Sequence, residues 1–266
     1  MGTVTSRDGT SIVFDRYGQG PPVVLVGGAF QYRAFDPRTA ELAKLMSADF
    51  TVYHYDRRGR GDSGDTAPYS VQREVDDLGA LIADAGGSAS VFGMSSGAAL
   101  ALDTAARGTA ITRLALYEAP FIVDNSRAPF PADYLPRLNT LLGQGRRGDA
   151  VRFWLRLVGV PGPVVALMRC TPAWRKFKAV AHTLPYDAVA LGDTMGGSPL
   201  PAGRWQEIAL PVLAAVGGNS PAWIHHGGQA LADVLPNAEH RILDGQTHMV
   251  KPKALAPMLT EFFTRR

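Results

Sequence analysis

Short apolar runs alternate along most of this chain with longer segments in which apolar residues recur every three or four positions. The stretch PPVVLVGG (21–28) is apolar throughout and stops at glycines, which is typical of a strand buried on both faces of a sheet. By contrast, Val75, Leu78 and Ile82 follow the spacing of one face of a helix. Strands that alternate with helices form a parallel sheet covered on both faces, so this pattern predicts an α/β fold.

Outside one central region, the sequence divides into predicted strands and predicted helices. The predicted strands are residues 11–18, 21–28, 50–56, 88–94, 112–118, 210–218 and 239–245. The predicted helices are residues 36–48, 71–85, 97–107, 222–235 and 253–265.

The central region, from residue 124 to about residue 203, shows helical patterns but no convincing strand. Prolines punctuate it, and its ten Lys and Arg residues against five Asp make it more basic than the rest of the chain. Because predicted strands precede and follow this region, it is interpreted as an insertion between two strands of one sheet. We therefore expect a core made of residues 1–123 and 204–266, with a helical insertion at 124–203.

The composition excludes several classes of function. The single cysteine, Cys170, cannot form an intramolecular disulfide or a cysteine metal cluster, and no metal is expected. The net charge is only +3 and no basic run is present, so nucleic-acid binding is not expected. No segment has the roughly 20 apolar residues that cross a bilayer, and the N-terminus lacks the apolar core of a secretory signal. We expect a soluble cytoplasmic protein, monomeric or homodimeric, without a membrane partner.

The stretch VFGMSSGAAL (91–100) contains a G-x-S-x-G pattern with Ser95 at its centre. This pattern, between a strand and an Ala-rich helix, is typical of a sharp turn that exposes a nucleophilic serine. The backbone N–H of Ser96 would then lie at a helix N-terminus, where it can stabilise an oxyanion. A second oxyanion donor is expected from the loop that follows residues 21–28, and the backbone N–H of Ala29 is the candidate.

A serine hydroxyl needs a base to accept its proton near neutral pH, and histidine is the usual base. His248 lies in DGQTHMV, a loop between the last predicted strand and the last helix. Such a loop lies at the carboxyl edge of a parallel sheet, where it can reach the turn at Ser95. The other five histidines lie in predicted strands, near the start of a helix or in the central region, and are not candidates for this base.

Four motifs in order resemble the α/β-hydrolase family: LVGGAF, YDRRGRGDSG (55–64), GMSSG and DGQTH. The resemblance implies the α/β-hydrolase fold, a mostly parallel eight-stranded sheet flanked by helices, with residues 124–203 as an α-helical cap over the active site. In the second motif, Asp56, Arg57, Gly59 and Gly61 are expected to build a tight loop with ion pairing inside it.

The chain departs from the usual family pattern at the acid that orients the histidine. That acid commonly follows the seventh strand, but here the chain reads GGNSP, with Ser220 where an aspartate is expected. Glu118, directly before Ala119 and Pro120, stands instead where lactone hydrolases of the zearalenone lactonase type carry their acid. Glu118 is therefore the preferred acid, and Asp124 is kept as the alternative.

The resemblance implies a serine hydrolase that cleaves a carboxylic ester or lactone. The aromatic and apolar side chains of residues 124–203 favour an apolar or aromatic small molecule as its substrate. Ser95, His248 and Glu118 would be catalytic, an acyl-enzyme would form on Ser95, and no cofactor is expected. The side chains expected to bind substrate are Phe30, Met94, Phe153, Trp154, His182 and Tyr186. The alternative is a catalytically altered relative: a C–C hydrolase, a cofactor-free lyase or cyclase, or a ligand-binding protein of the receptor kind.

Overall fold

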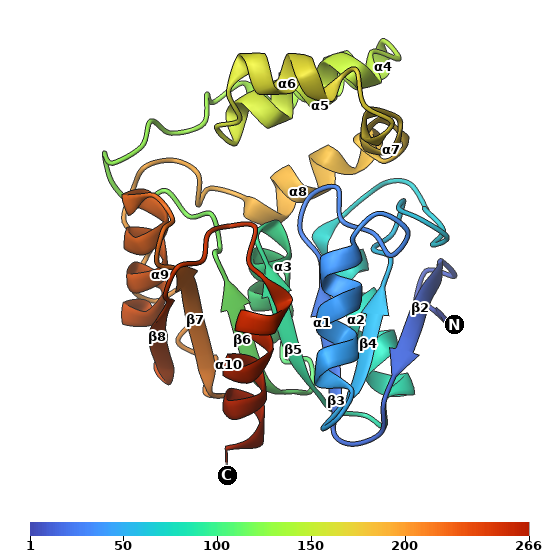
Figure 1. Ribbon diagram of the computed structural model, residues 1–266, viewed down its shortest axis with the longest axis vertical. Coiled ribbons are helices and arrows are strands. Elements are labelled where there is room, and N and C mark those ends of the chain that lie inside the picture. The colour runs from blue at the N-terminus through green and yellow to red at the C-terminus, as the bar shows by residue number, and fades with distance from the viewer. Residues whose placement is uncertain (266) are drawn as a thin grey trace.

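The structure, a computed structural model, describes residues 1–265. Across these residues one sheet of eight strands is formed, in the order β1-β2-β4-β3-β5-β6-β7-β8 (Figure 1). The pairs β1–β2 and β2–β4 are antiparallel, and every other neighbouring pair is parallel. The predicted mostly parallel, eight-stranded sheet is therefore confirmed. The strands are β1 (Gly2–Thr5), β2 (Ser11–Tyr17), β3 (Pro22–Val26), β4 (Thr51–Tyr55), β5 (Ala89–Met94), β6 (Ile111–Tyr117), β7 (Val212–Gly217) and β8 (Ala238–Leu243).

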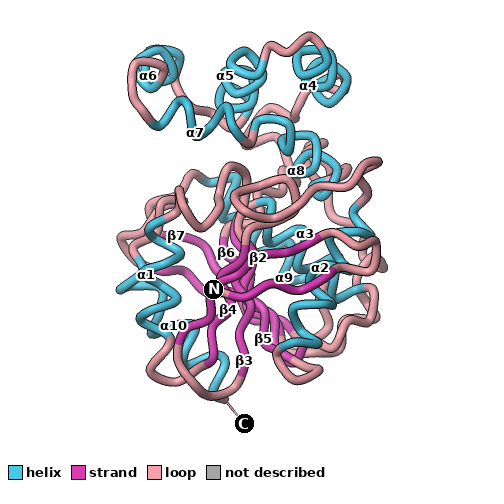
Figure 2. The backbone as a smooth tube through the Cα atoms, turned by 90° about the vertical axis from the view of Figure 1, so that its right-hand side faces the viewer, coloured by secondary structure: helices cyan, strands magenta, loops and turns pink. Residues whose placement is uncertain are grey.

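Helices cover both faces of this sheet (Figure 2). On one face lie α1 (Pro37–Met46) and α10 (Pro252–Thr264), which pack against each other. On the other face lie α2 (Val71–Asp84), α3 (Ser96–Ala106) and α9 (Ala222–Val234). All five helices lie where the apolar spacing predicted them.

The residues of β3 show why the central strands are apolar throughout. Val23 and Leu25 belong to the core cluster under α1 and α10, whereas Val24 and Val26 belong to the cluster on the opposite face. Successive side chains of a strand point to opposite faces, so a strand covered on both sides needs apolar residues at every position.

The short edge strand β1 was not among the predicted strands. Its four residues, GTVT, alternate between half-buried and exposed positions. Such a strand buries little apolar surface and resembles a polar loop in sequence. Its register with β2, rather than its composition, places it in the sheet.

The helical region between β6 and β7, here called the cap (residues 124–203), lies above the carboxyl ends of the parallel strands (Figure 1). It consists of α4 (Tyr134–Gly143), α5 (Arg147–Leu157), α6 (Gly162–Met168), α7 (Ala173–Ala179), the 3₁₀ helix η1 (Ala181–Thr183) and α8 (Leu184–Leu191). Within the described chain, α8 is the cap helix that packs most closely on the core, against α3.

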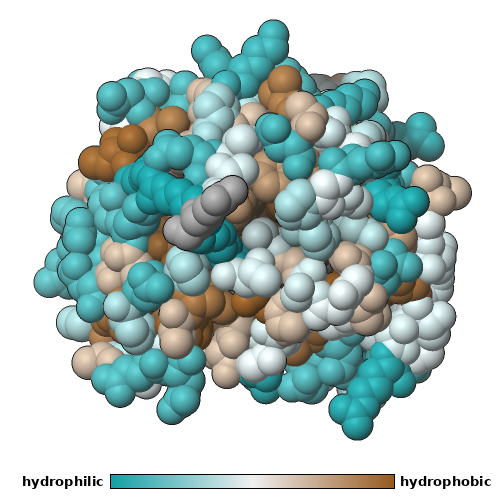
Figure 3. Space-filling view, turned by 90° about the horizontal axis from the view of Figure 1, so that it is seen from below, coloured by the Kyte–Doolittle hydropathy of each residue, from teal (hydrophilic) through white to brown (hydrophobic). Residues whose placement is uncertain are grey.

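The surface opposite the cap carries hydrophilic side chains around its margin with small apolar areas between them (Figure 3). No helix in residues 1–265 combines the length and the apolar character needed to cross a membrane.

Candidate active site

Ser95 occupies a strained turn between β5 and α3. Its φ and ψ angles are 57° and −129°, a backbone conformation that a residue with a side chain rarely adopts. The flanking glycines make the turn possible. A Cβ atom on Gly93 would lie 2.6 Å from the carbonyl oxygen of Gly97, and one on Gly97 would lie 2.6 Å from that of Gly27. The local sequence therefore forces Ser95 out at the tip of the turn, where it is half-buried.

Glu118 lies at the end of β6, the strand beside β5, and its carboxylate is buried. One carboxylate oxygen, Oε2, lies 2.8 Å from Nδ1 of His248. The other, Oε1, accepts hydrogen bonds from the backbone N–H of Gly217 at 2.9 Å and from the hydroxyl of Ser220. Burial by itself raises the pKa of Glu118, but the bonds from His248, Ser220 and Gly217 outweigh burial and lower it.

The carboxyl ends of β5, β6 and β7 bring these groups together. The backbone N–H of Ser95 donates to the carbonyl of Tyr117 at 3.0 Å, which fixes the turn beside Glu118. The Tyr117 hydroxyl donates to the carbonyl of Thr247 at 2.9 Å and so holds the loop that carries His248. In residues 1–265 no hydrogen bond joins Ser95 to His248; bonds of this kind are often long until substrate binds.

The alternative acid, Asp124, has a different partner. Its Oδ2 atom lies 2.5 Å from Nδ1 of His226, and its Oδ1 atom accepts from Ser126. The side chain is 41% exposed, whereas the side chain of Glu118 is fully buried. Of the two candidate acids, the structure brings only Glu118 to His248 within the described residues.

The loop after β3 lies directly against the serine. A Cβ atom on Gly28 would be 2.8 Å from the Cβ atom of Ser95, so only glycine allows this approach. The Gln31 side chain accepts from the N–H of Gly28 and donates to Asp36 at 2.6 Å, which fixes the loop. The backbone N–H groups of Ala29 and Ser96 have no hydrogen-bond acceptor among residues 1–265 and are free to bind an anion.

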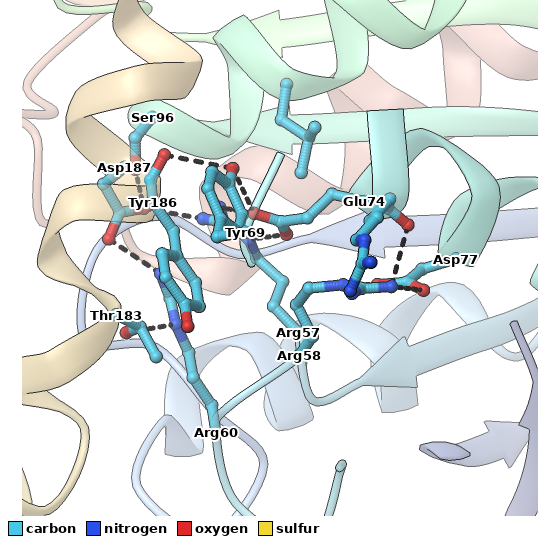
Figure 4. A network of polar contacts seen from close by, with 12 residues as sticks. Arg57, Arg58, Arg60, Tyr69, Glu74, Asp77, Ser96, Thr183, Tyr186 and Asp187 are labelled. Atoms are coloured by element: carbon cyan, nitrogen blue, oxygen red, sulfur yellow. Dashed lines mark hydrogen bonds and ion pairs between the residues drawn. The ribbon is translucent and has the colours of Figure 1, made fainter. Parts of the chain in front are cut away.

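A buried ionic network, drawn in Figure 4, contacts this loop through Arg57 and Arg60. Asp187, on α8 of the cap, binds Arg57, Arg60 and the hydroxyl of Ser96. Arg57 also binds both carboxylate oxygens of Glu74 at 2.7 Å. The network thus links the cap, the loop after β4 and the residue that follows Ser95.

We expected ion pairing inside the loop at residues 55–64, and that expectation is wrong. Asp56 pairs with Arg33 at 3.1 Å, outside the loop, and also accepts the N–H of Arg33 at 2.6 Å. Arg57, Arg58 and Arg60 all extend to carboxylates on α2, on α8 or near the N-terminus. The loop itself is tight as expected, because a Cβ atom on Gly61 would collide with the carboxylate of Asp56. Its arginines connect other elements instead of closing the loop.

The side chains expected to bind substrate fall into two groups. Phe30 and Met94 lie in the loop and strand next to Ser95, and the Phe30 ring packs edge-on against Phe177 of α7 with centroids 4.9 Å apart. The other four lie in the cap.

Phe153 lies under Arg137 of α4, and Trp154 is buried within the cap. Tyr186 stacks on Tyr69 with centroids 3.9 Å apart and donates to Asp65, which also lies 3.8 Å from His182. These contacts do not involve Ser95, so a substrate-binding role for the four cap residues stays a prediction.

Three contributors to the site were missed by the sequence reasoning. Ser220 attracted attention only as a missing aspartate, although its hydroxyl supports the carboxylate of Glu118. Gln31 and Asp187 carried no signal, because a single polar residue in a loop or helix is normally interpreted as solvated. Asp187 is identified by its long-range contact with Ser96, and Gln31 by its contact with the N–H of Gly28 in the loop beside Ser95.

Comparisons with known proteins agree with this architecture. The sequence profile of the alpha/beta hydrolase family matches residues 23–257. An alpha/beta hydrolase from Sphaerobacter thermophilus DSM 20745 is 55% identical over 99% of this chain and 100% of its own, with a TM-score of 0.91. No curated protein gives a significant match.

Two more distant structures share the fold. The enol-lactonase from Burkholderia xenovorans LB400 is 21% identical, with 99% of this chain and 100% of its own covered and a TM-score of 0.68. The esterase EaEST from Exiguobacterium antarcticum is 18% identical, with both chains covered to 100% and a TM-score of 0.71. The profile match over most of the sequence, together with the 55% identical structure, establishes that this chain belongs to the alpha/beta hydrolase family.

Proposed function

We propose that this protein is a serine hydrolase that cleaves a carboxylic ester or a lactone through an acyl-enzyme on Ser95. The observation that carries the proposal is the contact of 2.8 Å between Nδ1 of His248 and the buried carboxylate of Glu118. A carboxylate accepts at this position, so Nδ1 carries the proton and Nε2 is left free as the base.

In the proposed reaction, Ser95 Oγ attacks the carbonyl carbon while Nε2 of His248 accepts the hydroxyl proton. The imidazolium is stabilised by Glu118, whose lowered pKa keeps it ionised near neutral pH. His248 then gives its proton to the leaving alkoxide, and the acyl group stays on Ser95. A water molecule attacks the acyl carbon with His248 as base, which releases the carboxylic acid and restores the serine hydroxyl.

The oxyanion of the tetrahedral intermediate needs hydrogen-bond donors that are already in place. The free N–H groups of Ala29 and Ser96 are the proposed donors, because one follows Gly28 against the serine and the other begins α3. Loss of one such donor costs serine hydrolases on the order of 10²-fold to 10³-fold in turnover.

The substrate is proposed to be an apolar or aromatic small molecule. Met94 directly precedes Ser95, Phe30 lies in the loop whose Gly28 approaches Ser95, and Phe177 of the cap packs on the Phe30 ring. The distant structural relatives include an esterase and an enol-lactonase, which is consistent with either ester or lactone hydrolysis. We propose cap side chains Phe153, Trp154, His182 and Tyr186 as further contributors to substrate selection.

A ligand-binding protein of the receptor kind would need no orienting acid. The buried Glu118 has three hydrogen-bond partners, and one of them is an imidazole that is 45% exposed. Burying a carboxylate is costly unless it is well paired. A site that only binds a ligand does not need a buried carboxylate on a partly exposed imidazole, so this pairing supports catalysis.

Hydrolysis of p-nitrophenyl esters of increasing acyl length, and of a panel of lactones, tests the proposal. The wild-type protein is expected to turn over at least one of these classes, and Ser95→Ala is expected to reduce turnover to the background rate in buffer. Ser126→Ala, which changes an exposed serine in contact with Asp124, is the matched control and is expected to retain wild-type turnover. Turnover that persists in Ser95→Ala would contradict the proposal.

A further inference from the structure

The carboxylate of Asp187 comes from the cap, binds the side chain of Ser96, and reaches the loop after β3 through two arginines. Its Oδ1 atom accepts from the Ser96 hydroxyl at 2.8 Å and from Nη1 of Arg57 at 2.7 Å. Its Oδ2 atom accepts from Nη2 of Arg60 at 2.7 Å. The side chain has no exposed surface, so all of its contacts are made within the protein.

The two arginines carry this contact to the loop after β3. Nη1 of Arg60 donates to the carbonyl oxygen of Gly28 at 2.6 Å, and Nη1 of Arg57 donates to that of Gly27 at 3.2 Å. The Gly28 carbonyl and the Ala29 N–H belong to one planar trans peptide, in which the two groups point in opposite directions. Holding the carbonyl of Gly28 therefore fixes the direction of the Ala29 N–H.

The same contact also affects how strongly Ala29 donates. A charged donor on a peptide oxygen polarises that peptide, and hydrogen bonds in a chain strengthen one another in a low-dielectric interior. Arg60 has no exposed surface, so water does not screen its contact with Gly28. On the other side of Ser95, the bond from the Ser96 hydroxyl to Asp187 anchors the first residue of α3, whose N–H is the second proposed donor.

We propose that Asp187 is a positioning residue that sets both oxyanion donors, Ala29 through Arg60 and Ser96 directly. This inference rests on the proposed hydrolase function and extends it. The catalytic geometry would depend on how α8 of the cap packs on the core.

The charges of the network are consistent with this role. Arg57 and Arg60 face the two carboxylates of Glu74 and Asp187, which balances two cations with two anions in a buried site. Burial alone would raise the pKa of Asp187, but Arg60, Arg57 and the Ser96 hydroxyl outweigh burial and keep it below its ordinary value. The carboxylate is thus a charged acceptor at the pH where the enzyme would act.

A role limited to attaching the cap makes a different prediction from a positioning role. Asp187 would then need only its two arginines, and its loss would lower stability without a selective effect on the chemical step. Asp77 provides the matched control. Its carboxylate is equally buried and bound to an arginine, Arg58, at 2.7 and 2.8 Å, but neither residue contacts Ser96, Gly27 or Gly28.

The test compares Asp187→Asn, Ser96→Ala and Asp77→Asn with wild type for kcat, KM and Ki of an aryl trifluoromethyl ketone. This ketone adds to the serine and mimics the tetrahedral oxyanion. For Asp187→Asn we expect kcat to fall about 10²-fold and Ki to rise by a similar factor, with KM within about threefold of wild type. For Ser96→Ala, which keeps both ion pairs and the backbone N–H, the expected fall in kcat and rise in Ki are roughly tenfold.

Asp77→Asn is expected to unfold at a lower temperature but to keep kcat and Ki. If Asp187→Asn does not fold, Ser96→Ala decides the outcome. Unchanged kcat and Ki in folded Ser96→Ala, or a loss in Asp77→Asn equal to that in Asp187→Asn, would overturn the inference. Failure of the hydrolase proposal is distinguishable, because the wild-type protein itself would then neither hydrolyse esters nor bind the ketone.

Discussion

The Nδ1 atom of His248 lies 2.8 Å from the Oε2 atom of Glu118, although the two residues are 130 positions apart in the sequence. In serine proteases a carboxylate in this position holds the imidazole in one tautomer and stabilises its charged form. Its replacement by an amide there leaves the geometry intact but presents the wrong nitrogen to the serine.

Glu118→Gln is therefore expected to lower kcat for an activated ester by about 10⁴-fold, as the equivalent change does in a serine protease. Asp124→Asn, the matched control, removes a carboxylate that contacts His226 instead, and it should stay within about twofold of wild type. Steady-state kinetics on one chromogenic ester measures both. A collapse in Asp124→Asn with normal turnover in Glu118→Gln would reverse the assignment.

Ser220 is expected to support the acid without replacing it. Ser220→Ala removes one of the two hydrogen bonds to Oε1 of Glu118 and should lower kcat/KM by roughly tenfold. Ser126→Ala removes a similar serine–carboxylate bond at exposed Asp124 and should leave kcat/KM unchanged. Equal kinetics for the two variants would show that Ser220 contributes nothing to the orientation of the acid.

Ser220→Ala should also change the acid stability of the protein. The pKa of Glu118 is lowered in the folded state, so the ionised carboxyl stabilises the fold above its unfolded pKa, and this contribution is lost as the pH falls through the folded pKa. Because the Ser220 hydroxyl is one cause of the lowering, its removal reduces that contribution at neutral pH. Urea unfolding at pH 7 and below pH 4 measures the difference in unfolding free energy between wild type and Ser220→Ala. This difference should be larger at pH 7.

Gly28→Ala places a methyl group against the nucleophile. The added Cβ would lie 2.8 Å from the Cβ of Ser95 and 3.0 Å from the carbonyl oxygen of Met94, so the loop has to move away. We expect kcat/KM to fall at least 10²-fold through displacement of the Ala29 N–H.

Gly79→Ala is the control, since a Cβ there meets nothing within 4 Å and Ala favours the helix α2 by about 0.5 to 1 kcal/mol. It should keep full activity and unfold at a slightly higher temperature. Wild-type activity in Gly28→Ala would mean that the loop after β3 takes no part in the reaction.

His54, on β4, makes stability fall as the pH is lowered. Its side chain is buried with no partner for Nδ1 in the described residues, and burial lowers its pKa, with Asp36, Asp56 and Asp15 partly opposing this. Below about pH 6.5 the unfolded chain binds a proton that the folded chain does not. The stabilisation that comes from keeping His54 neutral is complete above pH 6.5. It is lost as the pH falls, by up to about 1.4 kcal/mol of unfolding free energy per pH unit.

Urea unfolding of His54→Leu between pH 8 and pH 5 checks this expectation. The variant should show a smaller loss of unfolding free energy over this range than wild type. His182 and His240, whose pKa values are also lowered mainly by burial, should retain part of the dependence. The same pH dependence in variant and wild type would exclude His54 as a source.

Local patterns in the sequence were sufficient to predict every strand except β1, the five helices that cover the sheet, and the turn at Ser95. The uninterrupted apolar residues of β3 and the glycines around Ser95 can be interpreted from the neighbouring sequence alone. Glu118 was found through a resemblance in its position, and its contact with His248 depends on the pairing of β6 with its neighbours.

Asp187 and Ser220 show why the rest could not be predicted. Asp187 lies on a short helix, where an aspartate is normally solvated. It is nevertheless buried against Arg57 and Arg60, which precede it by 130 and 127 positions in the sequence. Ser220 looks like a substitution that removes an acid until the carboxylate of Glu118 is seen beside it. Both depend on contacts between distant segments, which periodicity and spacing do not encode.

Covalent labelling by a fluorophosphonate, read by intact mass and peptide mapping, is the most direct test of a nucleophilic Ser95 activated by His248. We expect one adduct per chain on Ser95, with labelling abolished in Ser95→Ala and slowed at least 10³-fold in His248→Gln. No adduct on the wild-type protein, or an adduct on Ser96 with Ser95 unmodified, would contradict the account.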